Sequence, residues 1–135
     1  MPAASVELQK AVFVALKANA VISAAVGDRI HDRAPAKLSF PYLTFGRTSS
    51  YDWSTGTEIG TEHLFSIHVW SKAMGKSETL ELMAGVEEAL RAGNLTPKGH
   101  HLVNLTPDFA ETRFDEDLSL YHGLLRYRAV TEPKN

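Results

Sequence analysis

Histidine is the residue type in this chain with the widest chemical use, and the sequence contains six of them. Two or three imidazoles that converge can bind a metal ion. His63 and His68 are an odd number of positions apart in an expected strand and therefore point to opposite faces. The adjacent His100 and His101 diverge in the same way if they are extended. The spacing predicts no bound metal, and only convergence from different strands is left open.

Acidic side chains provide the second candidate chemistry. Asp108 follows Pro107, and Glu111 lies two positions before Arg113, an arrangement faintly similar to the carboxylate pairs of metal-dependent nucleases. In such sites the acids are further apart and a lysine stands beside them. We therefore expect a solvated turn, and a small metal-dependent hydrolase or nuclease that uses Asp108, Glu111 and a histidine is the alternative.

Nucleophile motifs and cofactor motifs are also missing from the sequence. No serine lies in a Gly-x-Ser-x-Gly elbow, and no glycine-rich phosphate loop precedes a helix. Cysteine is absent, which excludes a cysteine nucleophile, thiolate metal ligands and disulfide bonds. The sequence predicts a protein that is not an enzyme and binds no cofactor.

Size and composition are those of an ordinary globular protein. The chain has 135 residues, of which 44% are hydrophobic and 22% are charged, and we expect a single domain over residues 1–135. The formal net charge of −2 disfavours a dedicated DNA-binding protein. Glu7, Lys10 and Lys17 interrupt the apolar stretch near the N-terminus, so we expect neither a signal peptide nor a membrane partner.

Helices are predicted where apolar residues recur at helical spacing between suitable caps. Ser5 is expected to cap a helix that runs to about residue 18, and Asn19 and Gly27 bound a shorter one over residues 20–26. A third helix covers about residues 78–92, with Leu80 on its apolar face, and Gly93 ends it.

Strands are predicted in pairs before and after the third helix. The expected strands cover residues 42–46, 62–71, about 101–105 with a resumption through 114 after a bulge at Pro107, and 118–130. A loop of about fifteen residues, 47–61, joins the first pair, and an acidic turn over residues 115–117 joins the second. The order α-α-β-β-α-β-β predicts an α+β domain, in which an antiparallel sheet of about four strands packs its helices on one face.

Two strands carry large side chains on both faces, which indicates a protein interface. In the strand over residues 62–71, Phe65, Ile67 and Val69 form the better core face, and Leu64, His68 and Trp70 point the other way. In the last strand, Leu125, Tyr127 and Ala129 alternate with Leu124, Arg126, Arg128 and Val130. A helix over both faces, or a bulge that shifts the register, is the alternative.

The candidate contact residues mix aromatic, aliphatic and arginine side chains, a composition enriched at interfaces. Trp53 is added as a lid or a contact of the long loop. The full set is Trp53, Leu64, His68, Trp70, Leu124, Arg126 and Arg128.

Nearly the whole chain resembles the family of phage tail completion or tail terminator proteins, of the gene transfer agent and long-tailed prophage type. The resemblance rests on the order and spacing of six segments: Arg29-Ile30-His31-Asp32-Arg33-Ala34-Pro35, Phe40-Pro41-Tyr42-Leu43-Thr44, Asp52-Trp53-Ser54-Thr55, His68-Val69-Trp70-Ser71, Gly99-His100-His101-Leu102-Val103-Asn104-Leu105 and His122-Gly123-Leu124-Leu125-Arg126-Tyr127-Arg128-Ala129.

The resemblance implies a structural virion protein without catalytic residues. Such proteins form a ring, usually a homohexamer, on the head-proximal end of the tail tube, where they stop tube growth and meet the head connector. DNA would pass transiently through the lumen without sequence recognition, and assembly would take place in the host cytoplasm. A head-to-tail connector or adaptor is the runner-up of the same class.

Overall fold

The computed structural model describes residues 3–92 and 94–134 and has an α+β architecture, as the sequence predicts. Three helices and five strands follow one another along the chain. In chain order they are α1 (Ala4–Ala18), α2 (Ala20–Val26), β1 (Ile30–His31), β2 (Tyr42–Asp52), β3 (Thr61–Ser71), α3 (Ser77–Ala92), β4 (His100–Asp115) and β5 (Leu120–Pro133).

The sheet has one strand more than expected, and it is mixed. Its strand order is β1-β2-β3-β5-β4, and the four long strands pair with one another in antiparallel orientation. The additional strand β1 pairs in parallel with β2 through only two residues, Ile30 and His31. The sequence predicts a short extended segment over residues 28–35, but two residues are too few to show the periodicity of a strand of the sheet.

The β2–β3 loop is shorter than the sequence suggests. β2 continues to Asp52, so the predicted loop over residues 47–61 is wrong and the connection covers residues 53–60 only. A bulge between Phe45 and Thr48 shifts the register, after which pairing with β3 resumes. The polar composition after the bulge is typical of a loop, but a strand that extends beyond the core has no need of apolar residues.

The first two helices agree with prediction in extent and differ in one cap. The Asn19 side chain accepts a hydrogen bond from the backbone N–H of Ile22 at 3.1 Å, and Gly27 ends α2 with φ of 55°. The expected Ser5 cap of α1 is wrong, because the helix starts at Ala4 and Ala3 is its N-cap without a side-chain bond. The predicted stop of α3, Gly93, lies outside the described residues.

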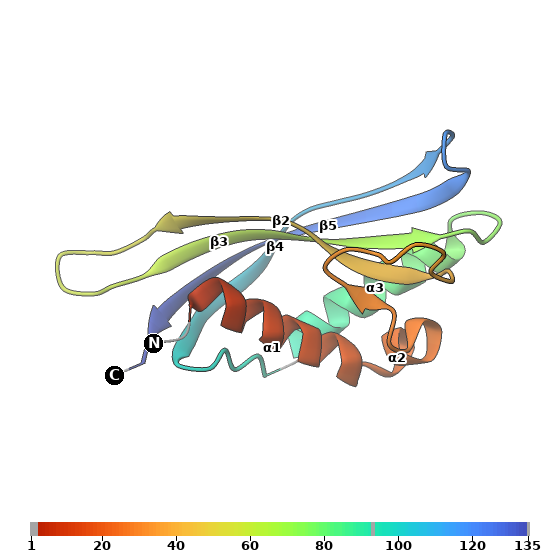
Figure 1. Cartoon of the computed structure of the whole chain (residues 1–135). Helices are drawn as coiled ribbons and strands as arrows, with labels where there is room; N and C mark the ends of the chain where they lie inside the picture. The colour runs from red at the N-terminus through yellow and green to blue at the C-terminus, as the bar shows by residue number, and fades with distance from the viewer. Residues whose placement is uncertain (1–2, 93, 135) are drawn as a thin grey trace.

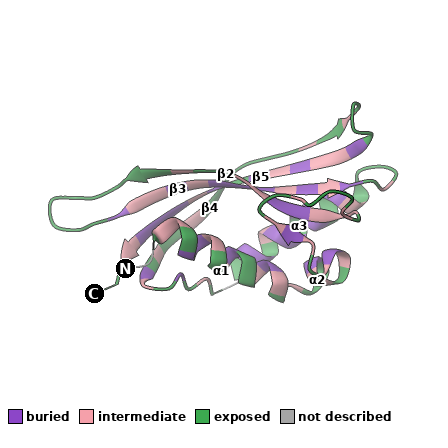
Figure 2. Ribbon diagram, viewed as in Figure 1, coloured by how far each residue is buried: buried purple, intermediate pink, exposed green. Residues whose placement is uncertain are grey.

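All three helices lie on one face of the sheet, as predicted (Figure 1). The buried positions gather between the helices and the strands (Figure 2). Phe65, Ile67 and Val69 of β3 belong to this core, which confirms the expected core face of that strand. Leu80 of α3 does not, because half of its surface is exposed. The buried hydrophobic core also includes Leu8, Val12, Leu16, Ile22, Val26, Leu43, Leu82, Val86, Leu90 and Leu125.

The last two strands form a long twisted hairpin. β4 runs without interruption from His100 to Asp115, with register shifts between Leu102 and Asn104 and between Pro107 and Phe109, so the predicted bulge at the proline is confirmed. β5 begins at Leu120, two residues later than expected, and the turn of the hairpin lies before it.

Within the described residues, no single helix is long and apolar enough to cross a membrane. α1 and α2 together have the required length and composition, but the two helices are bent by 85° relative to each other.

Candidate assembly surface

The face of the sheet that carries no helix, here called the open face, brings most of the predicted contact residues together (Figure 1). Leu64 pairs with Arg128 and His68 pairs with Leu124 across β3 and β5, and Ser66 pairs with Arg126. The side chains of Leu64, His68 and Trp70 alternate with the fully buried core positions of β3 and remain half-buried. No described helix covers the open face, so the strand alternation read from the sequence is confirmed there.

An aromatic and imidazole stack organises one end of the open face. The Trp70 ring lies parallel to His122 with centroids 4.1 Å apart, and His122 stacks on His68 at 4.9 Å. The Nδ1 of His68 and the Nε2 of His122 are joined by a hydrogen bond of 2.6 Å. The indole N–H of Trp70 donates to the Thr44 hydroxyl at 3.0 Å. Trp70 is therefore fixed as part of a surface cluster rather than packed in the core.

His122 was not among the predicted contact residues. It is paired with Trp70 in the register of β3 and β5, and it lies two positions before Leu124 on the same face. Extending the alternation of the last strand by one step towards its start would have identified His122.

Gly46 provides the room in which His68 lies. A Cβ at Gly46 would come within 2.2 Å of His68 Nε2 and within 3.1 Å of Ser66 Cβ. Any side chain at position 46 would therefore push the imidazole out of its stacked position.

The stacked histidines are both held neutral. Burial lowers the pKa of His68, and burial together with the neighbouring His68 and Arg113 lowers the pKa of His122 to about 4, against an opposing effect of Asp115. In a hydrogen bond between two imidazoles, one nitrogen donates and the other must be free of a proton. The stack is thus an uncharged element at neutral pH.

The two arginines of the open face already have partners within the chain. Arg128 donates to the Glu62 carboxylate, and the Arg126 guanidinium lies 5.0 Å from the centre of the Phe109 ring. Val130, which shares their strand face, is fully buried and so does not contribute to the exposed surface. The open face is therefore mixed in charge rather than a basic strip for nucleic acid.

Trp53 lies apart from the stack, at the tip of the β2–β3 hairpin. Its side chain is 47% exposed, so it is not a core residue. The backbone N–H of Trp53 donates to the Gly60 carbonyl at 2.9 Å, and a Cβ at Gly60 would lie 3.4 Å from its ring. A bond from the Ser54 N–H to the Asp52 carboxylate at 3.0 Å further orders the tip.

The candidate catalytic groups do not converge. His63 is buried beneath α1, where its Nε2 is 2.9 Å from the Thr131 hydroxyl, while His68 lies on the open face, as the odd spacing predicts. Asp108 lies within the β4 bulge, and Glu111 is opposite Leu124 on the open face. Among residues 3–92 and 94–134, no three histidine or acidic side chains could hold a metal ion together.

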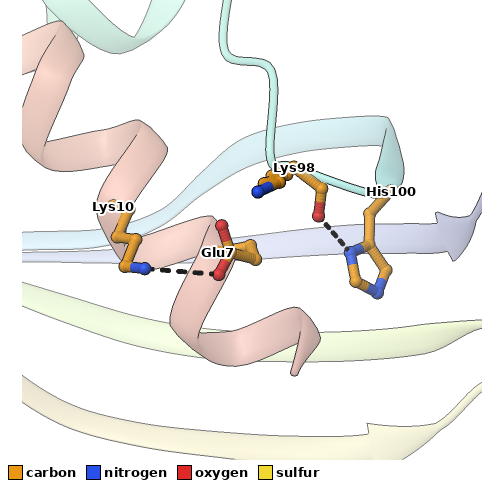
Figure 3. Close-up of polar contacts among 4 residues, drawn as sticks. All are labelled: Glu7, Lys10, Lys98 and His100. Carbon is orange, nitrogen blue, oxygen red and sulfur yellow. Dashed lines mark hydrogen bonds and ion pairs between the residues drawn. The ribbon is translucent and has the colours of Figure 1, made fainter. Parts of the chain in front are cut away.

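A concave region lies between α1 and α3 on the helical side of the molecule, with a volume of about 450 Å³. Figure 3 shows the polar groups near it: Lys10 reaches Glu7 at 3.5 Å, and His100 donates through Nδ1 to the Lys98 carbonyl at 3.0 Å. Because a carbonyl oxygen can only accept, the proton of that imidazole is on Nδ1. The rest of the lining is largely alanine and other aliphatic side chains, with Asn19, Glu88, Asn94 and Thr96 as its further polar members.

Comparison with known proteins finds one matching family and two similar solved structures. The family model described as tail completion protein gp17 matches residues 10–132. A chain in the structure of the virion of a native gene transfer agent particle is 32% identical, with a TM-score of 0.87 over 98% of this chain and 99% of that chain. The gp17 protein of bacteriophage SPP1 is 26% identical, with a TM-score of 0.66 over 98% of this chain and 91% of that one. The curated proteins contain no match.

Proposed function

Because the chain belongs to the tail completion protein gp17 family, which gives it a structural role in a phage-like tail, we propose that it forms a ring at the head-proximal end of the tail tube. There it ends tube growth and joins the tube to the head connector. The solved relatives support a place in such a particle, since one is a chain of a gene transfer agent virion and the other is a phage gp17 protein.

The observation that carries the proposal is the open face. A sheet with helices on one side only leaves its second side to water or to a partner, and this one presents a tryptophan fixed between Thr44 and His122. Preorganised aromatic side chains are typical centres of protein interfaces. We infer that Trp70, His68, Leu64, Leu124, Arg126 and Arg128 contact a neighbouring subunit or the stacked tail ring, and that Trp53 makes a separate contact at the hairpin tip.

A closed ring requires two different patches on each subunit, because a self-complementary contact would stop at a dimer. The proposed ring has six copies, as the family resemblance implies. The tail tube protein and the head connector protein are its further partners, DNA passes through its lumen without sequence recognition, and the protein has no enzymatic activity.

The first experiment combines Trp70→Glu with a matched control, Leu80→Glu, which places the same charge on an exposed leucine of the helical layer. We expect Trp70→Glu to abolish ring formation and tube capping while the monomer remains folded, and Leu80→Glu to leave both intact. Electron microscopy with and without purified tail tubes, together with circular dichroism, measures the two properties.

The proposed ring would be refuted if the wild-type chain stays monomeric at high concentration and does not bind tail tubes. If Trp70→Glu unfolds the monomer instead, Trp70 is a structural residue and the assigned contact is wrong. Binding to isolated connectors but never to tubes would favour the head-to-tail adaptor, the second candidate of the same class.

A further inference from the structure

A buried histidine beneath the first turns of α1 has no assigned role. His63 is fully buried, and its register places it between Ser50 of β2 and Ala129 of β5. Its Nε2 is 2.9 Å from the hydroxyl of Thr131, and its Nδ1 is 3.4 Å from the hydroxyl of Ser5. The Ser5 hydroxyl in turn lies 2.9 Å from that of Ser50. These bonds join the start of α1 to β2, β3 and β5.

The site around His63 suits a neutral imidazole. In the neutral ring one nitrogen donates and the other accepts, and a hydroxyl group can take either role. A second proton would place a positive charge on a fully buried ring whose partners are hydroxyl groups. Among the described residues, no carboxylate lies within ion-pair distance of His63. Because burial of an unpaired charge is costly, the closed site excludes the second proton.

The charged and titratable groups on the elements around His63 do not compensate such a charge. On α1, Glu7 is paired with Lys10 at 3.5 Å, and at the start of β4 the His100 ring donates to the carbonyl of Lys98 (Figure 3). β2 and β5 contribute hydroxyl groups to the site. Burial lowers the pKa of His63, and His100 acts in the same direction. The ring therefore takes up its second proton only if water can reach it.

The start of α1 is the part of this site that can move away while the sheet stays intact. Paired backbone groups hold β3 to both of its neighbours, β2 and β5. The first turn of α1 is attached by side chains, and its N-cap, Ala3, makes no side-chain hydrogen bond. A cavity of about 20 Å³ lies next to the His63 ring, between α1, β2 and β3, and is large enough for one water molecule. Opening at this end would admit water to the ring.

We propose that His63 is an acid-sensitive latch for the first two turns of α1, residues 4–11. While the ring is neutral, it holds the start of the helix on the sheet. When the ring gains a second proton, these two turns unwind and water reaches the imidazole. The rest of α1 stays packed, because Val12 and Leu16 lie deep in the hydrophobic core. This inference does not depend on the proposed ring and adds a response to acid within each subunit.

Hydrogen exchange measured by mass spectrometry at pH 7.5 and pH 5 tests the latch in the wild-type chain, with labelling times corrected for the intrinsic exchange rate. An imidazole that binds the second proton only in the open state, with the ordinary pKa of 6.5, favours opening about tenfold for each pH unit below that value. We therefore expect the protection of the amides of residues 7–11 to fall roughly tenfold or more at pH 5, while the amides of β3 keep theirs.

Two histidine variants identify the titrating group. His63→Gln removes the imidazole and keeps a side chain that can donate and accept, so the protection of residues 7–11 should be the same at both pH values. His101→Gln is the matched control, because His101 is exposed on β4, and this variant should respond to acid as the wild type does. If His63→Gln does not fold, NMR titration of the wild-type imidazoles replaces it, and His63 should gain its proton together with shifts of the amides of residues 7–11.

Three results would overturn the latch. The first is equal protection of residues 7–11 at both pH values in the wild type. The second is a loss of protection at pH 5 that persists in His63→Gln, or an NMR titration of His63 without change in these amides. The third is a parallel loss in α1 and β3, which would show that acid unfolds the whole domain. Each of these results leaves the proposed ring standing.

Discussion

The stacked pair of histidines on the open face makes the stability of the chain depend on pH. The folded state holds the pKa of His122 near 4, below its ordinary value of 6.5. An unfolded chain therefore binds a proton at His122 between these two values, and the folded chain does not. By linkage, the contribution of this residue is complete above pH 6.5 and is lost as the pH falls towards 4.

The size of the effect follows from the same values. A pKa of about 4 against 6.5 corresponds to about 3 kcal/mol at most, and partial exposure of the ring reduces this to roughly 1–3 kcal/mol. For a chain of 135 residues this is a fall in Tm of roughly 3–10 °C between pH 7 and pH 4. The main physical cause is burial of the His122 ring, which disfavours its charged form, and His68 and Arg113 act in the same direction.

Thermal unfolding of wild type and His122→Gln from pH 7.5 to 4 is the appropriate assay. The free energy of unfolding of the wild type should fall more steeply over this range, because the variant has no imidazole to protonate at this position. His101→Gln is a suitable control, since His101 is exposed on β4. Parallel pH profiles for wild type and His122→Gln would show that the buried imidazole does not make the stability depend on pH, and the reasoning from its burial would fail.

Two further substitutions test the packing of the helices. Gly123→Ala would place a Cβ 2.6 Å from Met83 Sδ, so overpacking should cost about 1–3 kcal/mol, measured by urea unfolding, while Gly56→Ala, where nothing lies within 4 Å, should cost much less. Asn19→Ala removes the cap of α2 and should cost about 1 kcal/mol, with Asn19→Ser restoring most of it, and equal stability of all three chains would contradict the role of the cap.

Sequence alone predicted the fold class and the open face because both depend on local periodicity. The alternation of buried and half-buried side chains in β3 can be read from consecutive residues. The Asn19 cap likewise needs only one side chain and the backbone N–H three residues later. The elements that were misjudged depend on contacts between distant parts of the chain. The pairing of β1 with Leu43 and Thr44, and the resumption of β2 after the bulge at Gly46, are decided by neighbouring strands.

The candidate site was predicted in composition and not in organisation. Trp70, His68 and Leu124 could be placed on one face by counting residues. Their stack depends on His122, which the register of β3 and β5 brings opposite Trp70 from far along the chain. The hollow between α3 and β4 has no local signature at all, because its walls come from α3, β4, β5 and the connection between α3 and β4.

The proline in β4 has a consequence for how the chain behaves before it meets its partners. β4 is the last strand of the sheet, and an outer strand with a free row of backbone groups invites uncontrolled pairing with other chains. Pro107 has no backbone N–H to donate to another strand. The two register shifts in β4 interrupt the regular spacing of its other backbone groups. Both features of β4 disfavour sheet-to-sheet aggregation at this edge of the sheet.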